Sequence, residues 1–522
     1  MKPFLLLATL VVAGWSQVSF DRILGAFKEQ HNWLTYSGDY GAVRFRNLKQ
    51  INTSNVRNLR PQWIYQTGVP GAFQTTPLVV DGVMYFTTGN GSAYALDARS
   101  GRELWRYRYP DSERTYVNRG AAILGQLLYM LTFEATLLAI DIRDGHLVWK
   151  TQIEKPPQGF AYTTLAPLAV KDKIVIGISG GEEGTRGFID AYYSATGQRA
   201  WRFWTVPAKG EPGSETWSGD SWKHGGGPTW LTGSYDPNLN MLYWGIGNPG
   251  PDLYGADRLG DNLYTGSLVA LDADTGQRRW HFQFTPHDLH DWDACQIPVL
   301  LDLKWQGRNR KVVVQANRNG FFYVLDRETG EFLLGKPFVR QTWAKGLDSN
   351  GRPIRMPNSD PTPEGTRVCP STLGGSNWMA PSYNPETGLL YVAATERCDI
   401  YYSSPSKFVQ GRRYMGGAFG GNQAEEEWGL VKAIDPLTGE TKWDFKLRRP
   451  SWAGTLATGG GLVFAGDEDG YLMALDARDG KMLWKFNTGN RLASAPITYM
   501  VGSRQYVTMP SGSALITFAL AN

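Results

Sequence analysis

Four oxygen-bearing side chains in this sequence could together bind a hard metal cation. The segment 285–294 (TPHDLHDWDA) carries two carboxylates, Asp291 and Asp293, just after a strand-like stretch. Upstream, Glu182 ends an isolated Ser-Gly-Gly-Glu sequence, and Asn248 lies in a Gly-Asn-Pro-Gly-Pro turn. Ligand sets made only of oxygen suit calcium or a larger trivalent ion of similar preference. These residues form a site only if the fold brings them together.

Two histidines, His287 and His290, lie beside the aspartates and raise the alternative of a zinc site. Zinc sites usually combine several nitrogen or sulfur ligands. The sequence offers no third ligand of this kind nearby, and the surrounding residues are rich in Asp. We therefore favour a hard cation over zinc at this segment.

The composition indicates a large globular protein built mainly of β-strands. The chain has 522 residues, of which 42% are hydrophobic and 20% charged, which is ample for a large core. It is rich in Gly (61), Trp (20) and Tyr (25), and long helical patterns are scarce, so we expect an all-β fold. The net charge of +4 is small and no basic run occurs, so we expect no nucleic-acid partner.

The N-terminus has the pattern of a secretory signal. A single positive charge precedes an apolar run over residues 4–14, which is too short to span a bilayer comfortably. We expect residues 1–16 to be removed, with cleavage between Ala13 and Gln17, and an uncleaved membrane anchor is the alternative. The mature chain, 17–522, is then expected to be a periplasmic, single-domain protein without an integral membrane segment.

The sequence contains three cysteines, Cys295, Cys369 and Cys398. An exported protein could join two of them in a disulfide bond. Their spacing alone does not say which two.

A motif of the form Ala-Leu-Asp, then a turn with Gly, then Trp recurs along the chain. In each copy an apolar strand ends at the Asp, the Gly lies in a polar turn, and a second strand carries the Trp. Named by their Gly and Trp, the copies are Gly101/Trp105, Gly145/Trp149, Gly197/Trp201, Gly276/Trp280, Gly439/Trp443, Gly480/Trp484 and a degenerate Gly330/Leu334.

Repeats of about 40–50 residues made of short strands predict a β-propeller. The gap from Leu334 to Trp443 has room for two blades, and the segment 383–391 marks the less regular one. Together with the seven copies of the motif, this segment predicts eight blades. The longer gap between Trp201 and Trp280 must hold an insertion. A β-solenoid is the alternative, but repeats of this length with Gly hairpins disfavour it.

A propeller explains how residues far apart in the sequence could form one site. Each blade directs its innermost strand and its loops toward the central axis. We therefore expect the four oxygen-bearing side chains to meet at one end of the channel.

The repeated motif resembles the tryptophan-docking motif of the quinoprotein alcohol dehydrogenases, which carry pyrroloquinoline quinone (PQQ). The resemblance begins at 32–39 (NWLTYSGD), covers nearly the whole mature chain, and includes site motifs that are far more specific than the repeat. It implies an exported enzyme that oxidises small alcohols, chiefly primary ones, to aldehydes. It also implies that electrons pass to a separate acceptor such as a soluble cytochrome c.

The resemblance implies roles for individual residues. The metal ligands would be Glu182, Asn248, Asp291 and Asp293. The cofactor contacts would be Gln74, Arg119, Thr164, Ser179, Gly180, Gly181, Trp230, Arg318, Asn377 and Trp452. Asp291, ionised beside the metal, would be the catalytic base, and Arg318 would stabilise negative charge on the quinone oxygen. Trp230 would be a flat floor under the quinone ring.

Asp293 bears on the identity of the metal. Calcium-dependent methanol dehydrogenases carry Ala at this position, whereas relatives that use lanthanides carry Asp. A trivalent ion prefers more negative ligands, so the resemblance favours a lanthanide, with calcium as the alternative. Asp293 could instead point away and hydrogen-bond a loop.

Two features of the resemblance concern cysteine. It implies a Cys369–Cys398 disulfide and a free, buried thiol at Cys295. The family's disulfide between adjacent cysteines, which covers the quinone, is absent, and Glu113 and Arg114 stand in its place. No haem-binding Cys-x-x-Cys-His occurs either, so we expect a separate electron acceptor.

Two other functions remain open. A non-enzymatic scaffold propeller of the outer-membrane assembly type shares the repeat, but it has no reason to hold the acidic set together with Arg318. A sugar or polyol dehydrogenase of the same superfamily would hold that set as well. The loops 204–224 and 340–370, which would form the pocket walls, do not decide between these substrates.

Overall fold

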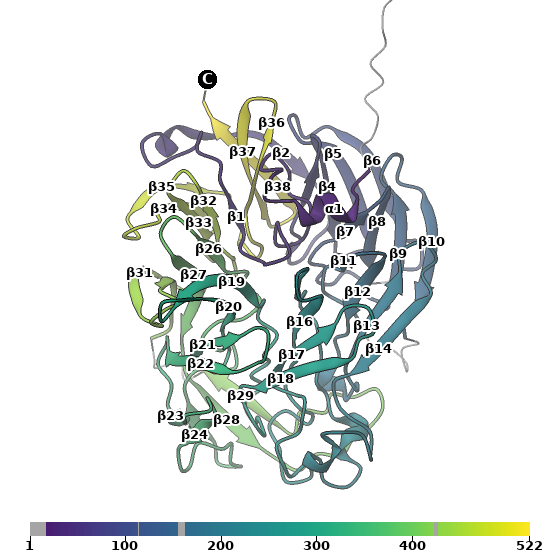
Figure 1. The fold of residues 1–522 in the computed structure, drawn as a ribbon, viewed down its shortest axis with the longest axis vertical. Coiled ribbons are helices and arrows are strands. Elements are labelled where there is room, and N and C mark those ends of the chain that lie inside the picture. The colour runs from purple at the N-terminus through teal and green to yellow at the C-terminus, as the bar shows by residue number, and fades with distance from the viewer. Residues whose placement is uncertain (1–16, 113, 155–161, 422–425, 522) are drawn as a thin grey trace, which may run out of the picture.

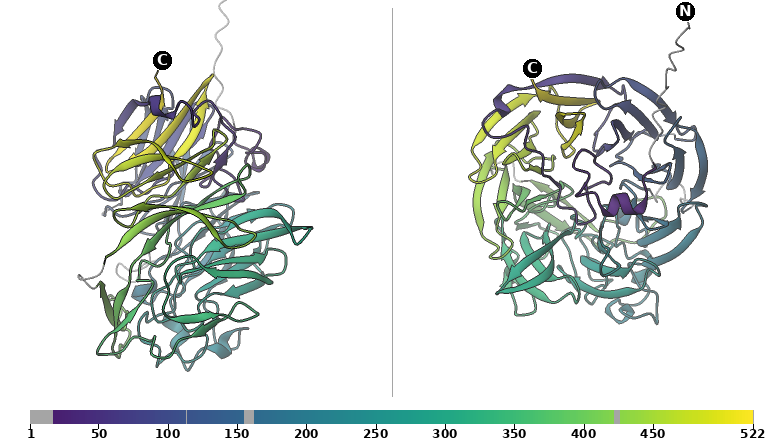
Figure 2. Two further views of the ribbon diagram at one scale, coloured as in Figure 1. Left: turned by 90° about the vertical axis from the view of Figure 1, so that its left-hand side faces the viewer. Right: turned by 45° about the horizontal axis from the view of Figure 1, so that its top comes forward.

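The computed structural model describes residues 17–112, 114–154, 162–421 and 426–521. Within these residues, eight sheets of four or five strands follow one another around a central axis (Figures 1 and 2). The fold is therefore the predicted all-β, eight-bladed propeller with tryptophan-docking motifs. In this described part, no helix has the length and apolar character needed to cross a membrane. The expected signal segment, 1–16, lies outside it.

The first five blades each use four consecutive antiparallel strands. These are β3 (Leu78–Val80), β4 (Val83–Thr88), β5 (Ser92–Asp97) and β6 (Glu103–Arg108); β7 (Ala122–Leu124), β8 (Leu127–Leu131), β9 (Thr136–Asp141) and β10 (Leu147–Gln152); β11 (Leu168–Val170), β12 (Lys173–Gly177), β13 (Phe188–Tyr193) and β14 (Arg199–Trp204); β15 (Ser234–Asp236), β16 (Met241–Gly245), β17 (Ser267–Asp272) and β18 (Arg278–Gln283); and β19 (Val299–Trp305), β20 (Arg308–Ala316), β21 (Phe321–Asp326) and β22 (Phe332–Pro337). First strands such as β3, β7 and β11 are buried on both faces. Fourth strands such as β10 alternate between half-buried and exposed residues, because one of their faces meets solvent.

The sixth blade corrects the prediction of two blades between Leu334 and Trp443. It consists of β26 (Ser382–Asn384), β27 (Leu389–Glu396), β30 (Trp428–Ile434) and β31 (Thr441–Leu447). The segment 383–391 and Trp443 therefore belong to one sheet. The additional length forms a hairpin of β23 (Ala344–Leu347) and β24 (Pro353–Arg355), and a sheet of β25 (Thr366–Val368), β28 (Asp399–Ser403) and β29 (Gly417–Gly421).

The ring closes in a blade that uses both ends of the chain. The seventh blade holds β32 (Leu456–Thr458), β33 (Leu462–Gly466), β34 (Tyr471–Asp476) and β35 (Met482–Asn487), with β1 (Phe45–Arg46) parallel to β32. The eighth pairs β36 (Ile497–Val501), β37 (Arg504–Ser511) and β38 (Ala514–Leu520) with the early strand β2 (Leu59–Gln66). In Figure 2 the yellow C-terminal strands lie beside purple N-terminal ones. The predicted number of blades is right, but this blade holds no complete copy of the motif.

The repeated Trp and Gly join neighbouring blades. The Trp105 indole N–H donates to the Ile142 carbonyl at 2.8 Å, and a Cβ atom on Gly145 would lie 2.7 Å from the Trp105 ring. Gly145 also has a φ of +81°, which favours glycine. Trp63 of the closing strand contacts Gly101 in the same way. At the degenerate copy, Leu334 lies beside Gly439 in place of a Trp.

The few helices are short and lie in the connections. They are α1 (Phe20–Leu24), η1 (Val56–Asn58), η2 (Gly181–Glu183), η3 (Ser214–Thr216) and η4 (Ser221–His224). The last two lie in the predicted insertion between Trp201 and Trp280. Of these, η2 bears directly on the site because it carries Glu182.

Candidate active site

The sequence-predicted site residues come from loops at one end of the propeller. Strand direction alternates within a blade, so the loop before a first strand and the loop between the second and third strands open at the same end. The residues in loops before first strands are Gln74, Arg119, Thr164, Trp230, Asp291, Asp293, Asn377 and Trp452, and those between second and third strands are Ser179, Gly180, Gly181, Glu182, Asn248 and Arg318.

Most of these residues line one cavity of about 360 Å³, a volume typical of small-molecule sites. The predicted residues in its wall are Arg119, Thr164, Ser179, Gly180, Glu182, Trp230, Asp291, Asp293, Arg318 and Asn377. Gln74 and Trp452 line a smaller neighbouring cavity that shares Arg119 with the first. Asn248 is buried, and its backbone N–H donates to Asp293 at 2.9 Å.

The loop that carries the two aspartates is shaped by Asp288. Its carboxylate accepts hydrogen bonds from the backbone N–H groups of His290 (3.0 Å) and Trp292 (2.7 Å). Such an Asx turn projects Asp291, which has the unusual φ of +58°. The Trp292 side chain is fully buried and donates to the Ser371 carbonyl. This anchor fixes the loop against the protein core.

Arg318 faces both aspartates across the cavity. Its Nη1 lies 2.6 Å from Asp293 Oδ2, and its Nη2 lies 3.4 Å from Asp291 Oδ2. The Trp230 indole N–H also donates to Asp293 Oδ2, at 3.0 Å. Asp293 therefore lines the cavity while its oxygens accept hydrogen bonds. Its position agrees with both expectations for this residue: it lies at the cavity, and it also hydrogen-bonds its neighbours. Both are possible because carboxylate oxygens can accept more than one contact.

Burial opposes the ionisation of both acids, and Arg318 favours it. Burial raises the pKa of Asp291 well above its ordinary value, although Arg318 lowers it. Burial raises the pKa of Asp293 in the same way, again opposed by Arg318. A cation bound beside Asp291 would favour its charged form, because a positive charge stabilises the ionised form of a nearby acid.

The opposite wall suits a flat anionic ligand. Arg119 Nη1 donates to Thr164 Oγ1 at 2.7 Å, and Thr164 Oγ1 lies 3.3 Å from Ser179 Oγ. The Arg119 guanidinium stacks over the Trp230 ring at 4.8 Å. Burial lowers the pKa of Arg119 to about 10, so it stays protonated at neutral pH. Charged, hydroxyl and aromatic groups thus converge on one side of the cavity.

Several buried polar atoms around this wall lack a hydrogen-bond partner within the described part of the protein. They are Arg119 Nε, Gln74 Oε1, Asn377 Oδ1 and Trp378 Nε1. Buried polar groups are costly when unpaired. A planar ligand that carries carboxylates and ring heteroatoms would supply their partners. The residues present therefore fit PQQ.

The sequence analysis missed several cavity residues. Tyr116, Tyr162 and Trp378 line the wall, and the Tyr116 and Tyr162 rings pack edge to face at 5.4 Å. They come from loops without a motif, and Trp378 could have been suspected because it follows Asn377. Glu113 lies outside the described residues, and the Arg114 guanidinium lies 5.7 Å from the Phe133 ring.

The two histidines do not form a zinc site. His287 Nδ1 lies 2.8 Å from the Gly260 carbonyl oxygen. His290 stacks on Trp292, and its Nε2 lies 2.9 Å from the Ser359 carbonyl oxygen. Both rings are thus occupied by backbone contacts in the loop that carries Asp291.

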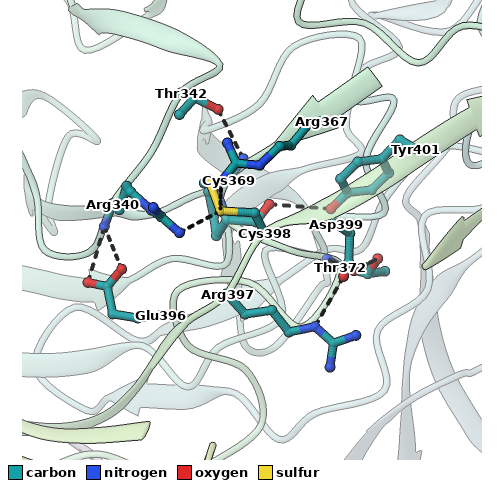
Figure 3. Close-up of a disulfide and its surroundings, with 11 residues drawn as sticks. Arg340, Thr342, Arg367, Cys369, Thr372, Glu396, Arg397, Cys398, Asp399 and Tyr401 are labelled. Atoms are coloured by element: carbon teal, nitrogen blue, oxygen red, sulfur yellow. Dashed lines mark hydrogen bonds and ion pairs between the residues drawn. A yellow bond between two sulfur atoms is a disulfide. The ribbon is translucent and has the colours of Figure 1, made fainter. Parts of the chain in front are cut away.

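The predicted disulfide between Cys369 and Cys398 is present (Figure 3), and Cys295 is a buried free thiol. Close to the disulfide, Asp399 Oδ2 accepts hydrogen bonds from the backbone N–H (3.0 Å) and hydroxyl (2.9 Å) of Thr372. The Thr372 carbonyl in turn accepts a hydrogen bond from Arg318 Nε at 3.0 Å. The disulfide therefore ties together two segments that hold Arg318 in place.

Comparison with known families agrees with this geometry. The profile of the family described as "Glucose/ethanol/alcohol dehydrogenase, beta-propeller domain" matches residues 33–341. The profile described as "Outer membrane protein assembly factor BamB" matches residues 427–520. The first match covers more than half of the chain and contains most of the cavity residues.

Similar individual proteins are quinoproteins. The quinoprotein alcohol dehydrogenase PedH of Pseudomonas putida is 37% identical, over 97% of this chain and 91% of PedH. The lanthanide-dependent methanol dehydrogenase of Methylacidiphilum fumariolicum is 34% identical, over 94% of this chain and 86% of that protein. A europium-containing methanol dehydrogenase structure superposes with a TM-score of 0.91 at 32% identity, covering 96% of this chain and all of that one. The chain therefore belongs to the family of PQQ-dependent alcohol dehydrogenases.

Proposed function

We propose that this protein oxidises primary alcohols to aldehydes with PQQ and a lanthanide ion, and passes the electrons to a separate acceptor such as a cytochrome c. The observation that carries the proposal is the convergence of Asp291, Asp293 and Arg318 on one cavity beside Trp230. The similarity to alcohol and methanol dehydrogenases supports the same reaction.

The choice of a lanthanide rests on charge. Glu182, Asp291 and Asp293 bring three carboxylates to the cavity wall, and the Asn248 side chain offers an amide oxygen beside them. Hard cations prefer such oxygen ligands, and a trivalent ion gains more from three carboxylates than calcium does. A lanthanide-dependent relative is consistent with this choice. Calcium is the alternative.

The reaction requires one group from the cofactor and several from the protein. When bound, the quinone supplies an electrophilic carbonyl that accepts the hydride equivalent of an alcohol. Asp291, ionised beside the cation, accepts the hydroxyl proton of the substrate at a carboxylate oxygen. Arg318 places fixed positive charge where negative charge develops. Trp230 orients the flat ring.

The cavity wall favours alcohols with an apolar chain. Leu373 and Phe419 line the cavity together with the acids, and burial of a substrate alkyl group against them is favourable. Arg397 and Asp399 also line it, but they form an ion pair with each other at 3.1 Å, so they offer fewer free groups to sugar hydroxyls. A sugar or polyol substrate is therefore the second candidate.

The test is reconstitution of the apo protein. Purified protein is mixed with PQQ and either La³⁺ or Ca²⁺, and turnover is followed with an artificial electron acceptor on a panel of alcohols and sugars. We expect no activity without PQQ and metal, and the highest activity with La³⁺ and primary alcohols. An absence of turnover on every substrate after reconstitution would overturn the enzyme assignment.

The variant Asp293→Ala separates the two metals. We expect it to lose the La³⁺-dependent activity, because the site loses one of its negative charges. Full activity of both proteins with Ca²⁺ alone would instead support the calcium alternative. Metal content of the purified proteins gives an independent reading.

We also propose that residues 1–16 are a signal peptide and that 17–522 form one periplasmic domain. The apolar run and the continuous ring of blades support this proposal. N-terminal sequencing of the protein recovered from the periplasm tests it. A first residue before Ala13 would contradict the predicted cleavage site.

A further inference from the structure

A buried carboxylate that forms no ion pair within the described part of the chain lies next to the candidate metal site. Asp252 follows Asn248 in the loop between β16 and β17, and its side chain is fully buried (0% exposed). Among the described residues, neither of its carboxylate oxygens has a hydrogen-bond partner. A buried, unpaired carboxylate is costly to the folded protein, so its position calls for a partner that these residues do not supply.

The acids of the cavity lie within electrostatic reach of Asp252. Burial raises the pKa of Asp252 well above its ordinary value, and the charges of Asp291 and Glu182 raise it further. The side chain of Asn248 lies close enough to lower it. Asp252 thus lies beside Asn248 and within electrostatic reach of the three carboxylates that line the cavity.

Few positively charged side chains in the described part of the chain form ion pairs with these acids. Arg318 faces Asp291 and Asp293. Arg258 is also buried and donates to the backbone carbonyls of Pro251, Asp252 and Asp288, and its guanidinium lies within electrostatic reach of the Asp288 and Asp252 carboxylates. The four carboxylates of Glu182, Asp252, Asp291 and Asp293 thus gather in one region, and among the described residues the ion pairs of this group are those of Arg318 with Asp291 and Asp293.

The surrounding loops prevent Asp252 from turning toward solvent. The Leu253 N–H donates to the Met415 carbonyl at 2.8 Å, and the Tyr414 N–H donates to the Glu182 carbonyl at 2.5 Å. One segment, 414–415, therefore binds both the loop of Asp252 and the helix of Glu182. The Arg258 bonds to the carbonyls of this loop add a third restraint.

We propose that Asp252 is a fourth carboxylate of the cation site, which acts through its charge from beside Asn248 and makes the site selective for a trivalent ion. This inference rests on the proposed metal-dependent function. A trivalent ion offsets more of the negative charge of these carboxylates than a divalent ion does.

The test compares cation binding by the metal-free, PQQ-containing protein and by its Asp252→Asn variant prepared in the same way. La³⁺ and Ca²⁺ affinities are measured by calorimetry or by competition with luminescent Tb³⁺, without any turnover assay. We expect the variant to bind La³⁺ about 10–100-fold more weakly, the usual effect of removing a group that supports a metal ligand. Because Coulomb energy scales with the charge of the cation, the loss for Ca²⁺ should be about 5–20-fold.

Thermal unfolding provides a second readout. The apo Asp252→Asn protein should melt at a higher temperature than the apo wild type, because an uncompensated charge is removed. Its gain in melting temperature on adding La³⁺ should be smaller. Asp257→Asn, an exposed carboxylate of the same loop, is the matched control and should change neither quantity.

Each outcome is decisive. Unchanged La³⁺ and Ca²⁺ affinities in Asp252→Asn would overturn this inference and leave the proposed function intact. Equal fold-losses for the two ions would also overturn it, because charge would then not be the cause. A wild-type protein that binds neither cation in the presence of PQQ would overturn the proposed function, and this inference with it.

Discussion

Asp291 and Asp293 lie two residues apart, yet their neighbours give them different chemistry. Asp293 accepts hydrogen bonds from Asn248, Trp230 and Arg318. The contact of Asp291 with Arg318 is longer, at 3.4 Å, and its side chain lines the cavity. Asp291 thus has the greater freedom to accept a proton from a substrate, whereas Asp293 is held in place by its neighbours.

The first prediction follows from this difference. Asp291→Asn should lower turnover by at least about 100-fold, because the amide cannot accept the hydroxyl proton. PQQ binding, measured by absorbance of the gel-filtered complex, should survive. The control is Asp257→Asn, which removes an exposed carboxylate that does not line the cavity and should leave turnover unchanged. Near-normal turnover of Asp291→Asn would remove Asp291 from the mechanism.

A second residue-scale prediction concerns His281 on β18. Burial, with Arg278 adding to it, lowers the pKa of His281 from 6.5 to about 4. The folded protein then binds fewer protons than the unfolded chain between these values, so stability falls as pH drops from 6.5 to 4. Replacing His281 by Gln should reduce this acid-induced loss of unfolding free energy by up to about 3 kcal/mol.

The measurement is the free energy of unfolding of both proteins, followed by denaturant at several pH values. The two curves should agree above pH 7 in their dependence on pH and separate in acid. His146→Gln, at an exposed histidine, is the control. Parallel curves for wild type and His281→Gln down to pH 4 would show that this ring does not contribute to the pH dependence of stability.

At the scale of elements, the propeller is held together by a Trp of one blade that packs on a Gly turn of the next. The Gly serves two purposes at once, since its backbone is left-handed and its missing side chain admits the indole ring. The two contributions can be separated, because some turns have the same backbone but no Trp. Gly276 and Gly388 form such a pair, with φ values of +70° and +71°.

We predict that Gly276→Ala destabilises the protein more than Gly388→Ala. A Cβ atom at Gly276 would lie 2.4 Å from the Trp201 ring, whereas one at Gly388 has no atom within 4 Å. Gly388→Ala should cost about 1–2 kcal/mol for its backbone alone, and Gly276→Ala a further ~1–3 kcal/mol for overpacking. Denaturant unfolding measures both. Equal losses would show that the Trp–Gly contact adds nothing.

The disulfide is a second element-scale feature. Replacing Cys369 and Cys398 together by Ser should lower the free energy of unfolding by about 3 kcal/mol, because a loop of this length is no longer closed in the unfolded chain. Reduced turnover is also expected, since Thr372 supports Arg318. Cys295→Ser, at the buried free thiol, is the control. A double variant as stable as the wild type would contradict the prediction.

At the scale of the whole molecule, stability depends on closing the ring. Strand β2 pairs with β38 across the two chain ends, and Trp63 on β2 then docks on Gly101 of the first blade. The N-terminal strand therefore joins the last blade to the first. An open ring would expose unpaired strand edges, which promote aggregation.

We predict that a chain ending at Ser513, which lacks β38, does not form a stable monomer. Size-exclusion chromatography and limited proteolysis should show aggregation and rapid cleavage. Removing only residues 521–522 should have no such effect. A monomeric, protease-resistant protein that ends at Ser513 would show that closure is dispensable.

The sequence by itself determined the class of fold and most of the candidate site. Gly and Trp recur at fixed spacing because each blade needs one close contact with the next, and such a local requirement is visible in the sequence. The acidic residues and Arg318 could be recognised because their motifs are local as well. The family resemblance pointed to the pairing of Cys369 with Cys398.

Only the tertiary structure decided how the strands are distributed among the blades and which further groups lie at the site. The prediction of two blades between Leu334 and Trp443 was wrong because strand pairing, not chain length, defines a sheet, and the eighth blade draws a strand from the other end of the chain. Asp252 carries no motif. Its importance arises from burial and from the carboxylates around it, and both are set by loops of neighbouring blades that meet only in the folded propeller.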